Sequence, residues 1–131
     1  MYITHFQGHI DRERMLALVR EYPLGCVHVV DLPYRLCSWA LDSPDTVALW
    51  EDDSGRLLAW AVFQTPFWTL DYAVHPAAPP DALTTILHWA NATAPALLGT
   101  SYGRPSWFVA VSAKLVDLHT VLEAAGYASQ E

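Results

Sequence analysis

The chain has 131 residues, of which 53% are hydrophobic and 16% are charged, and its formal net charge is −7. This length and apolar content predict a single domain, residues 1–131, with a sizeable core, and they exclude a disordered chain. The seven basic residues are scattered along the sequence. We therefore expect no nucleic-acid partner, because binding to phosphates needs clustered Lys and Arg.

Nothing in the sequence indicates a membrane contact, since no run approaches the roughly 18 apolar residues of a membrane span. The first residues also lack the charged and apolar segments of a signal peptide. The two cysteines, Cys26 and Cys37, are too few for a disulfide scaffold. We expect a cytoplasmic protein with two reduced, partly buried thiols, and one bridge between them stays open as the alternative.

The first helix is predicted over residues 11–21. Asp11 can cap its N-terminus, and Ile10 and Met15 have the spacing of a hydrophobic staple. A second, short helix is expected over residues 36–41. The apolar stripe of the first helix and the proline that ends it are Met15, Leu18, Val19, Tyr22 and Pro23.

Strands are predicted over residues 46–51, 56–64 and 68–74, and a further short strand is expected over residues 2–6. The first two of these form a hairpin, whose acidic turn ends on Gly55, a residue suited to positive φ. Several of the strands are apolar on both faces. This pattern predicts a sheet that is covered by helices on both sides.

The C-terminal half alternates helix and strand. Helices are predicted over residues 81–94 and 114–125, with Gly126 as a natural stop for the second, and a strand over residues 107–111. The step from residue 68 to residue 111 should be a right-handed parallel crossover. The expected fold class is α/β (α+β), with a mixed, mostly antiparallel sheet and helices on both faces.

Three segments resemble the GNAT superfamily of N-acetyltransferases. Residues 50–61 (WEDDSGRLLAWA) resemble the hairpin of its second and third strands, and residues 70–76 (LDYAVHP) resemble its fourth strand, which typically ends in Val-x-Pro. Residues 123–127 (EAAGY) resemble the ending of its fourth helix. The match covers residues 46–127 well and residues 1–45 loosely. The chain looks most like the N-terminal, degenerate half of a tandem GNAT protein.

The resemblance implies acetyl-CoA as the cofactor. GNAT enzymes hold its pyrophosphate on backbone N–H groups at the start of the helix that follows the fourth strand, where the helix dipole favours an anion. The backbone groups implied here are those of Val74, Pro76, Ala82, Leu83 and Thr84.

The loop departs from the family pattern in a way that weakens anion binding. The basic position of the family falls on Pro79, and its glycine positions fall on Pro80, Ala82 and Thr84. Proline donates no N–H, side chains hinder close approach of the backbone, and Asp81 adds a negative charge. A plain structural role fits better, with Pro80 as the first helical residue and Asp81 in the first turn.

The resemblance also implies a general base on the fourth strand. Asp71 and His75 alternate along one face there, and either side chain can take a proton from an amine. The alternative is that both are ordinary polar residues of a half-exposed strand. Leu115 and Leu122 fall where many family members carry a CoA-contacting Asn and a proton-donating Tyr. Leucine can do neither job, and we expect both to lie on the apolar face of the last helix.

The sequence gives less support to a metal site and to an aromatic ligand pocket. His5 and His9 have helical metal-ligand spacing, but no helix is predicted between them, and we expect no metal site. The tryptophans could line an apolar ligand pocket, although most are expected in the core. They are Trp39, Trp50, Trp60, Trp68, Trp89 and Trp107.

A complete GNAT domain continues past its fourth helix into two more strands, so the chain is expected to be either a fragment of a longer protein or an N-terminal half-module of a tandem GNAT protein. The strand at residues 107–111 is then expected to leave an exposed sheet edge, which a second GNAT domain or a homodimer partner would cover. Three functions follow: a GNAT-like scaffold with weak or lost acetyl-CoA binding, an active acetyl-CoA-dependent N-acetyltransferase on a small amine, or a small-ligand binding module.

Overall fold

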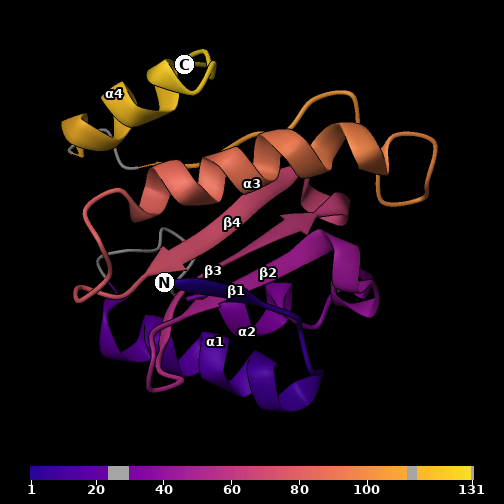
Figure 1. Ribbon diagram of the computed structural model, residues 1–131. Coiled ribbons are helices and arrows are strands. Elements are labelled where there is room, and N and C mark those ends of the chain that lie inside the picture. Colours follow the sequence, from indigo (N-terminus) through magenta and orange to yellow (C-terminus); the bar gives the residue numbers. More distant parts are fainter. Residues whose placement is uncertain (24–29, 112–114, 131) are drawn as a thin grey trace.

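A four-stranded antiparallel sheet lies at the centre of the computed structural model, which describes residues 1–23, 30–111 and 115–130 (Figure 1). The strands neighbour one another in chain order. The prediction of these strands is confirmed, with small differences at their ends. They are β1 (Tyr2–Thr4), β2 (Val47–Glu51), β3 (Leu57–Gln64) and β4 (Thr69–Val74).

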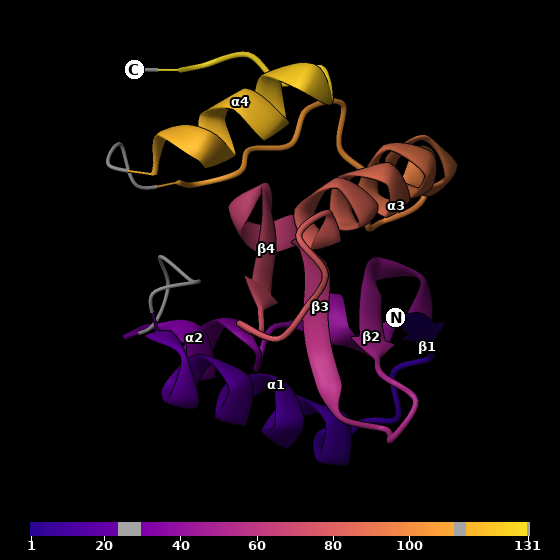
Figure 2. The same cartoon turned by 60° about the vertical axis from the view of Figure 1, so that its left-hand side comes forward.

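Helices cover both faces of the sheet, as the apolar strands predicted. On one face lie α1 (His9–Glu21) and the short α2 (Leu32–Arg35), and on the other lies α3 (Ala82–Leu97) (Figure 2). The last helix, α4 (Val116–Ala124), lies on the same side of the sheet as α3, and its Leu122 belongs to the core on that face (Figure 2). None of the helices in the described ranges is long and apolar enough to cross a membrane.

The sheet has an apolar core on each face. β3 contributes to both cores and is buried along its whole length. Trp60 belongs to the core under α1, where its indole N–H donates to the carbonyl of Met15 at 3.2 Å. Phe63 belongs to the core under α3, and its ring contacts Trp89 and Trp107. Alternate residues of one strand therefore supply both cores.

The hairpin between β2 and β3 has the turn that the sequence predicts. Gly55 has a φ of 84°, and the side chain of Asp52 accepts hydrogen bonds from the backbone N–H groups of Ser54 and Arg56. The Ser54 hydroxyl donates to the same carboxylate at 2.7 Å. These bonds lower the pKa of Asp52 from 3.8 to about 2, with the Ser54 hydroxyl as the largest cause.

The start of α1 differs from the prediction. The helix begins at His9 with Gly8 as its N-cap, so Asp11 lies inside the first turn. The Asp11 carboxylate instead accepts from the backbone N–H of Gln7 at 2.7 Å and pairs with Arg14. Ile10 is largely exposed and forms no staple with Met15, because the earlier start turns it away from the core.

The segment before β2 also differs from the prediction. No helix spans residues 36–41. A turn of helix ends at Arg35, and a 3-10 turn follows at Trp39–Asp42. Cys37 is exposed, which contradicts the expected partial burial, and Cys26 lies outside the described residues. The prediction failed because such short helices carry no sustained periodicity.

Residues 107–111 lie beside β4 but form no regular strand. The backbone of Phe108 makes an isolated parallel bridge to Thr69, so the predicted parallel direction is confirmed. Leu115, expected on the apolar face of the last helix, is the N-cap of α4 and is 41% exposed. Leu122 is buried as expected. After α4, Gly126 has a φ of 96° and ends the helix as predicted.

Candidate functional site

The loop from β4 to α3 uses most of its own backbone donors. The N–H of His75 bonds to the carbonyl of Leu58 at 2.7 Å, and the N–H of Ala78 bonds to the carbonyl of His75 at 2.9 Å. The N–H of Ala77 donates to Nδ1 of His75 at 2.9 Å. Because the three prolines of this loop have no N–H at all, little of the loop remains to meet an anion.

The first turn of α3 is the remaining place for a phosphate. The helix begins at Ala82, one residue later than predicted, so that Asp81 is the N-cap and Pro80 precedes it. The N–H of Ala82 bonds to the carbonyl of Pro79 at 3.0 Å. The N–H groups of Leu83 and Thr84 belong to the first turn and have no partner within the helix. Asp81 is the N-cap residue and makes no side-chain bond to the turn, and its negative charge disfavours an anion there.

Asp71, the first candidate base, forms an ion pair with the side chain of Arg35. Arg35 donates from Nε to Oδ2 of Asp71 at 2.8 Å and from Nη2 to Oδ1 at 2.9 Å. The Thr69 hydroxyl donates to Oδ1 at 3.0 Å. Both partners of the ion pair are buried, with 6% and 2% exposure, and the guanidinium also lies over the ring of Phe67. A two-point pair of this kind fixes the carboxylate in place and occupies the lone pairs that a base would use.

His75, the second candidate base, is half-buried at the end of β4. Its ring packs against Tyr22, with the centroids 4.5 Å apart. Asp71 and His75 share a face of the strand, but four residues of extended chain separate them by roughly 13 Å. That face carries the core of α1, whereas α3 packs on the other face. The predicted bases and the first turn of α3 therefore do not converge on one site.

The sequence did not indicate a cleft that opens on the described surface. A cleft of about 810 Å³ lies between α3, the extended residues 106–111, α4 and the tail that follows it. The side-chain amide of Asn91 bridges two of its walls by donating to the carbonyl of Ala125 at 3.1 Å. Burial raises the pKa of Tyr127, which lines the cleft. No motif could reveal it, because its walls come from four separate segments.

The predicted set of tryptophans forms no common pocket. Trp50 and Trp60 are core residues, as expected, and Trp39 and Trp68 are exposed. Of the six, Trp107 alone lines the cleft.

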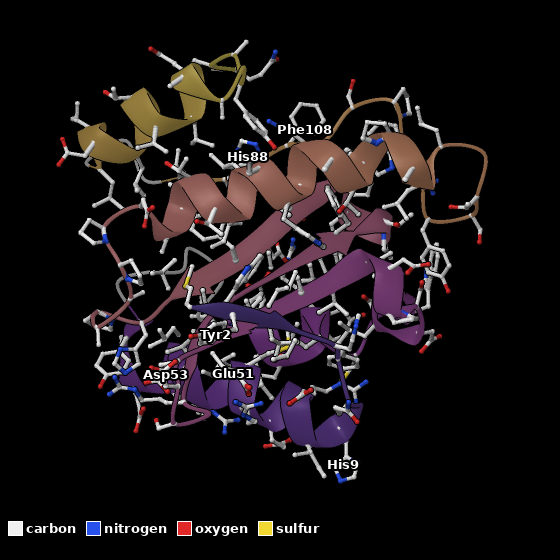
Figure 3. The ribbon with its side chains drawn as sticks, viewed as in Figure 1. Tyr2, His9, Glu51, Asp53, His88 and Phe108 are labelled. Carbon is white, nitrogen blue, oxygen red and sulfur yellow. The ribbon has the colours of Figure 1, made fainter. Side chains whose placement is uncertain are left out.

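His5 and His9 do not lie on one helix, because α1 begins at His9 and His5 precedes it. The helical spacing of metal ligands therefore does not apply to this pair. Figure 3 shows His9 pointing away from the sheet at the start of α1. Across the described residues, no group of three or more His, Cys, Asp or Glu side chains is placed to hold a metal ion.

No family model, curated protein or solved structure matches this chain.

Proposed function

We propose that the chain is a GNAT-like domain that binds acetyl-CoA weakly or not at all and that works by packing against a partner. The order of elements supports the resemblance. Four antiparallel strands are followed by α3 and by a segment that returns parallel to β4 at Phe108. This is the strand–helix–strand step expected of residues 68–111 from the sequence.

The observation that carries the proposal is the start of α3. Pro79 and Pro80 present no N–H, the N–H of Ala82 is bonded within the loop, and the Asp81 carboxylate lies at the N-cap. A pyrophosphate needs several converging donors and a positive field. Here it would meet two first-turn N–H groups and a negative charge. The buried pair of Asp71 with Arg35 supports the same reading for the acetyl-transfer step.

Calorimetric titration of the chain with acetyl-CoA tests the proposal. We expect no saturable heat at micromolar concentrations. In the variant Asp81→Gly the charge is removed and a good N-cap residue is kept, so that any residual affinity of the turn should increase. The matched control is Asp53→Asn, which removes a charge from the distant hairpin turn. Micromolar binding by the wild-type chain would refute the loss of the cofactor and favour an active N-acetyltransferase.

A further inference from the structure

We propose that the cleft between residues 106–111 and α4 binds an extended polypeptide segment of a partner protein, which adds a β-strand to the free edge of residues 107–111. The inference rests on the proposed function, because it names the surface and the partner of a domain that works by packing. Figure 2 shows this segment running between β4 and α4, and Figure 3 places Phe108 beside α3 on the side of α4.

The first step is the direction of the backbone groups. The N–H of Phe108 donates to the carbonyl of Trp68, and its carbonyl accepts from the N–H of Leu70, both at 2.9 Å. Both polar groups of Phe108 thus point at β4. In extended chain the next residues point theirs the opposite way. The backbone groups of Trp107 and Val109 therefore face away from β4, toward the cleft.

The second step is that these groups have no protein partner. Within the described ranges, hydrogen bonds of the backbone in residues 107–111 are made by Phe108 alone, so the N–H and C=O groups of Trp107, Val109, Ala110 and Val111 are left without one. The indole Nε1 of Trp107 is also shielded from solvent and has no partner there. Trp107, Val109 and Val111 are half-buried against the second core. Backbone groups in such surroundings are normally paired, so that a strand laid alongside would be stabilised.

The third step is that the edge lacks the usual protection. Natural sheet edges carry charged side chains or prolines that prevent pairing with another chain. The sequence of residues 106–111 is SWFVAV, which contains neither. Its side chains alternate between exposed and half-buried, although only Phe108 is bridged to β4. Nothing in the sequence of this segment therefore opposes pairing with another chain.

The opposite wall defines the chemistry of the occupant. It consists of α4 and the tail, and it offers apolar contact at Leu122 and Tyr127 beside the polar His119 and Glu123. The chain as a whole carries a net charge of −7. An uncharged or basic strand with alternating β-branched side chains fits this lining, whereas an acidic one is repelled. In strand addition, main-chain bonds supply the affinity, and side-chain pockets supply the specificity.

Fluorescence anisotropy with the whole chain tests the inference. The probe is the fluorescein-labelled peptide Lys-Val-Thr-Val-Thr-Val-Lys, and we expect saturable binding in the micromolar range. The same peptide N-methylated at alternate residues lacks the donors on one edge and should bind about tenfold more weakly or less. Replacing both lysines of the probe by glutamate should also weaken binding.

Two proline variants separate the free edge from general damage. Val109→Pro removes an N–H that faces the cleft, and Ala110→Pro removes the neighbouring N–H, which faces β4. We expect loss of peptide binding for V109P and retention for A110P, with both variants checked for folding by circular dichroism. Absence of binding by the wild-type chain, equal binding of the N-methylated probe, or equal loss in both variants would overturn the inference.

Two further outcomes would identify a different occupant or a different function. A concentration-dependent dimer that V109P abolishes and A110P keeps would assign the edge to a second copy of this chain and overturn the peptide assignment. The acetyl-CoA titration reports separately on the proposed function, because the first turn of α3 does not line the cleft. Coenzyme binding together with peptide binding would refute the loss of the cofactor and leave the strand site standing.

Discussion

At the scale of single residues, the most consequential contact is the buried pair of Arg35 and Asp71. It joins α2 to β4 in the interior, and Arg35 also contacts Thr69, the ring of Phe67 and, at 3.8 Å, the carboxylate of Asp31. Ion pairs that are buried add little stability relative to apolar residues of similar size, but removing one partner leaves an uncompensated charge. The pair therefore holds α2 against the sheet at β4.

We expect Arg35→Met to lower the free energy of unfolding by about 3–5 kcal/mol, because the carboxylate of Asp71 stays buried without its cation. The double variant Arg35→Met with Asp71→Leu should recover most of the loss, since neither charge remains. Urea denaturation followed by tryptophan fluorescence measures both. An R35M variant as stable as the wild-type chain would contradict the burial of this pair.

At the scale of elements, the hairpin of β2 and β3 depends on the ionised side chain of Asp52. The folded pKa of Asp52 is about 2, below its ordinary value of 3.8. A depressed pKa of this kind contributes stability that is present above the unfolded value and is lost as the pH falls through the folded one. The turn should therefore weaken between about pH 4 and pH 2.

Thermal unfolding across this pH window measures the effect. The wild-type chain should lose more stability than Asp52→Asn, which has no charge to lose. Asp53→Asn is the matched control, because Asp53 accepts none of the hydrogen bonds that hold the turn. A pH dependence that D52N leaves unchanged would assign the acid sensitivity to other carboxylates.

At the scale of the whole molecule, the interior strand β3 and the last helix α4 are held very differently. Every residue of β3 is buried between two cores, whereas α4 buries Leu122 alone and is joined to α3 by the bond of Asn91 to Ala125. Local opening follows such differences in burial. We therefore expect α4 to open before the sheet does.

Native-state hydrogen exchange should therefore show α4 amides exchanging well before those of β3. Adding the strand-forming peptide should slow exchange at Val109 and in α4, because the occupant would contact both walls. Equal protection of α4 and β3 in the free chain would show that α4 is packed as firmly as the sheet.

Prediction from the sequence succeeded where a local pattern decides the structure. The hairpin around Gly55 and the stop at Gly126 follow from backbone conformations that few other residues adopt, and both are confirmed. It failed at Asp11, Ile10 and Leu115, where a shift of a few residues in a helix start changes which side chains face the core. The cap position depends on how the helix docks, which no short pattern contains.

The candidate site was predictable only in part. The scarcity of N–H donors before α3 could be anticipated, because proline lacks an N–H in any fold; the weak anion binding inferred from it stays a prediction. The partner of Asp71 could not, since Arg35 lies 36 positions away in a segment without periodicity. The GNAT resemblance and the function that it implies stay predictions.

The sequence by itself determined the sheet, the helices on both its faces and the poverty of phosphate donors near Pro80, because these depend on the alternation of apolar residues and on backbone chemistry. Only the tertiary structure decided that Asp71 is paired, that His75 contacts Tyr22, and that residues 106–111 face a cleft. Each of these joins residues that are distant along the chain. Such contacts are set by how whole elements pack, and a linear pattern carries no record of them.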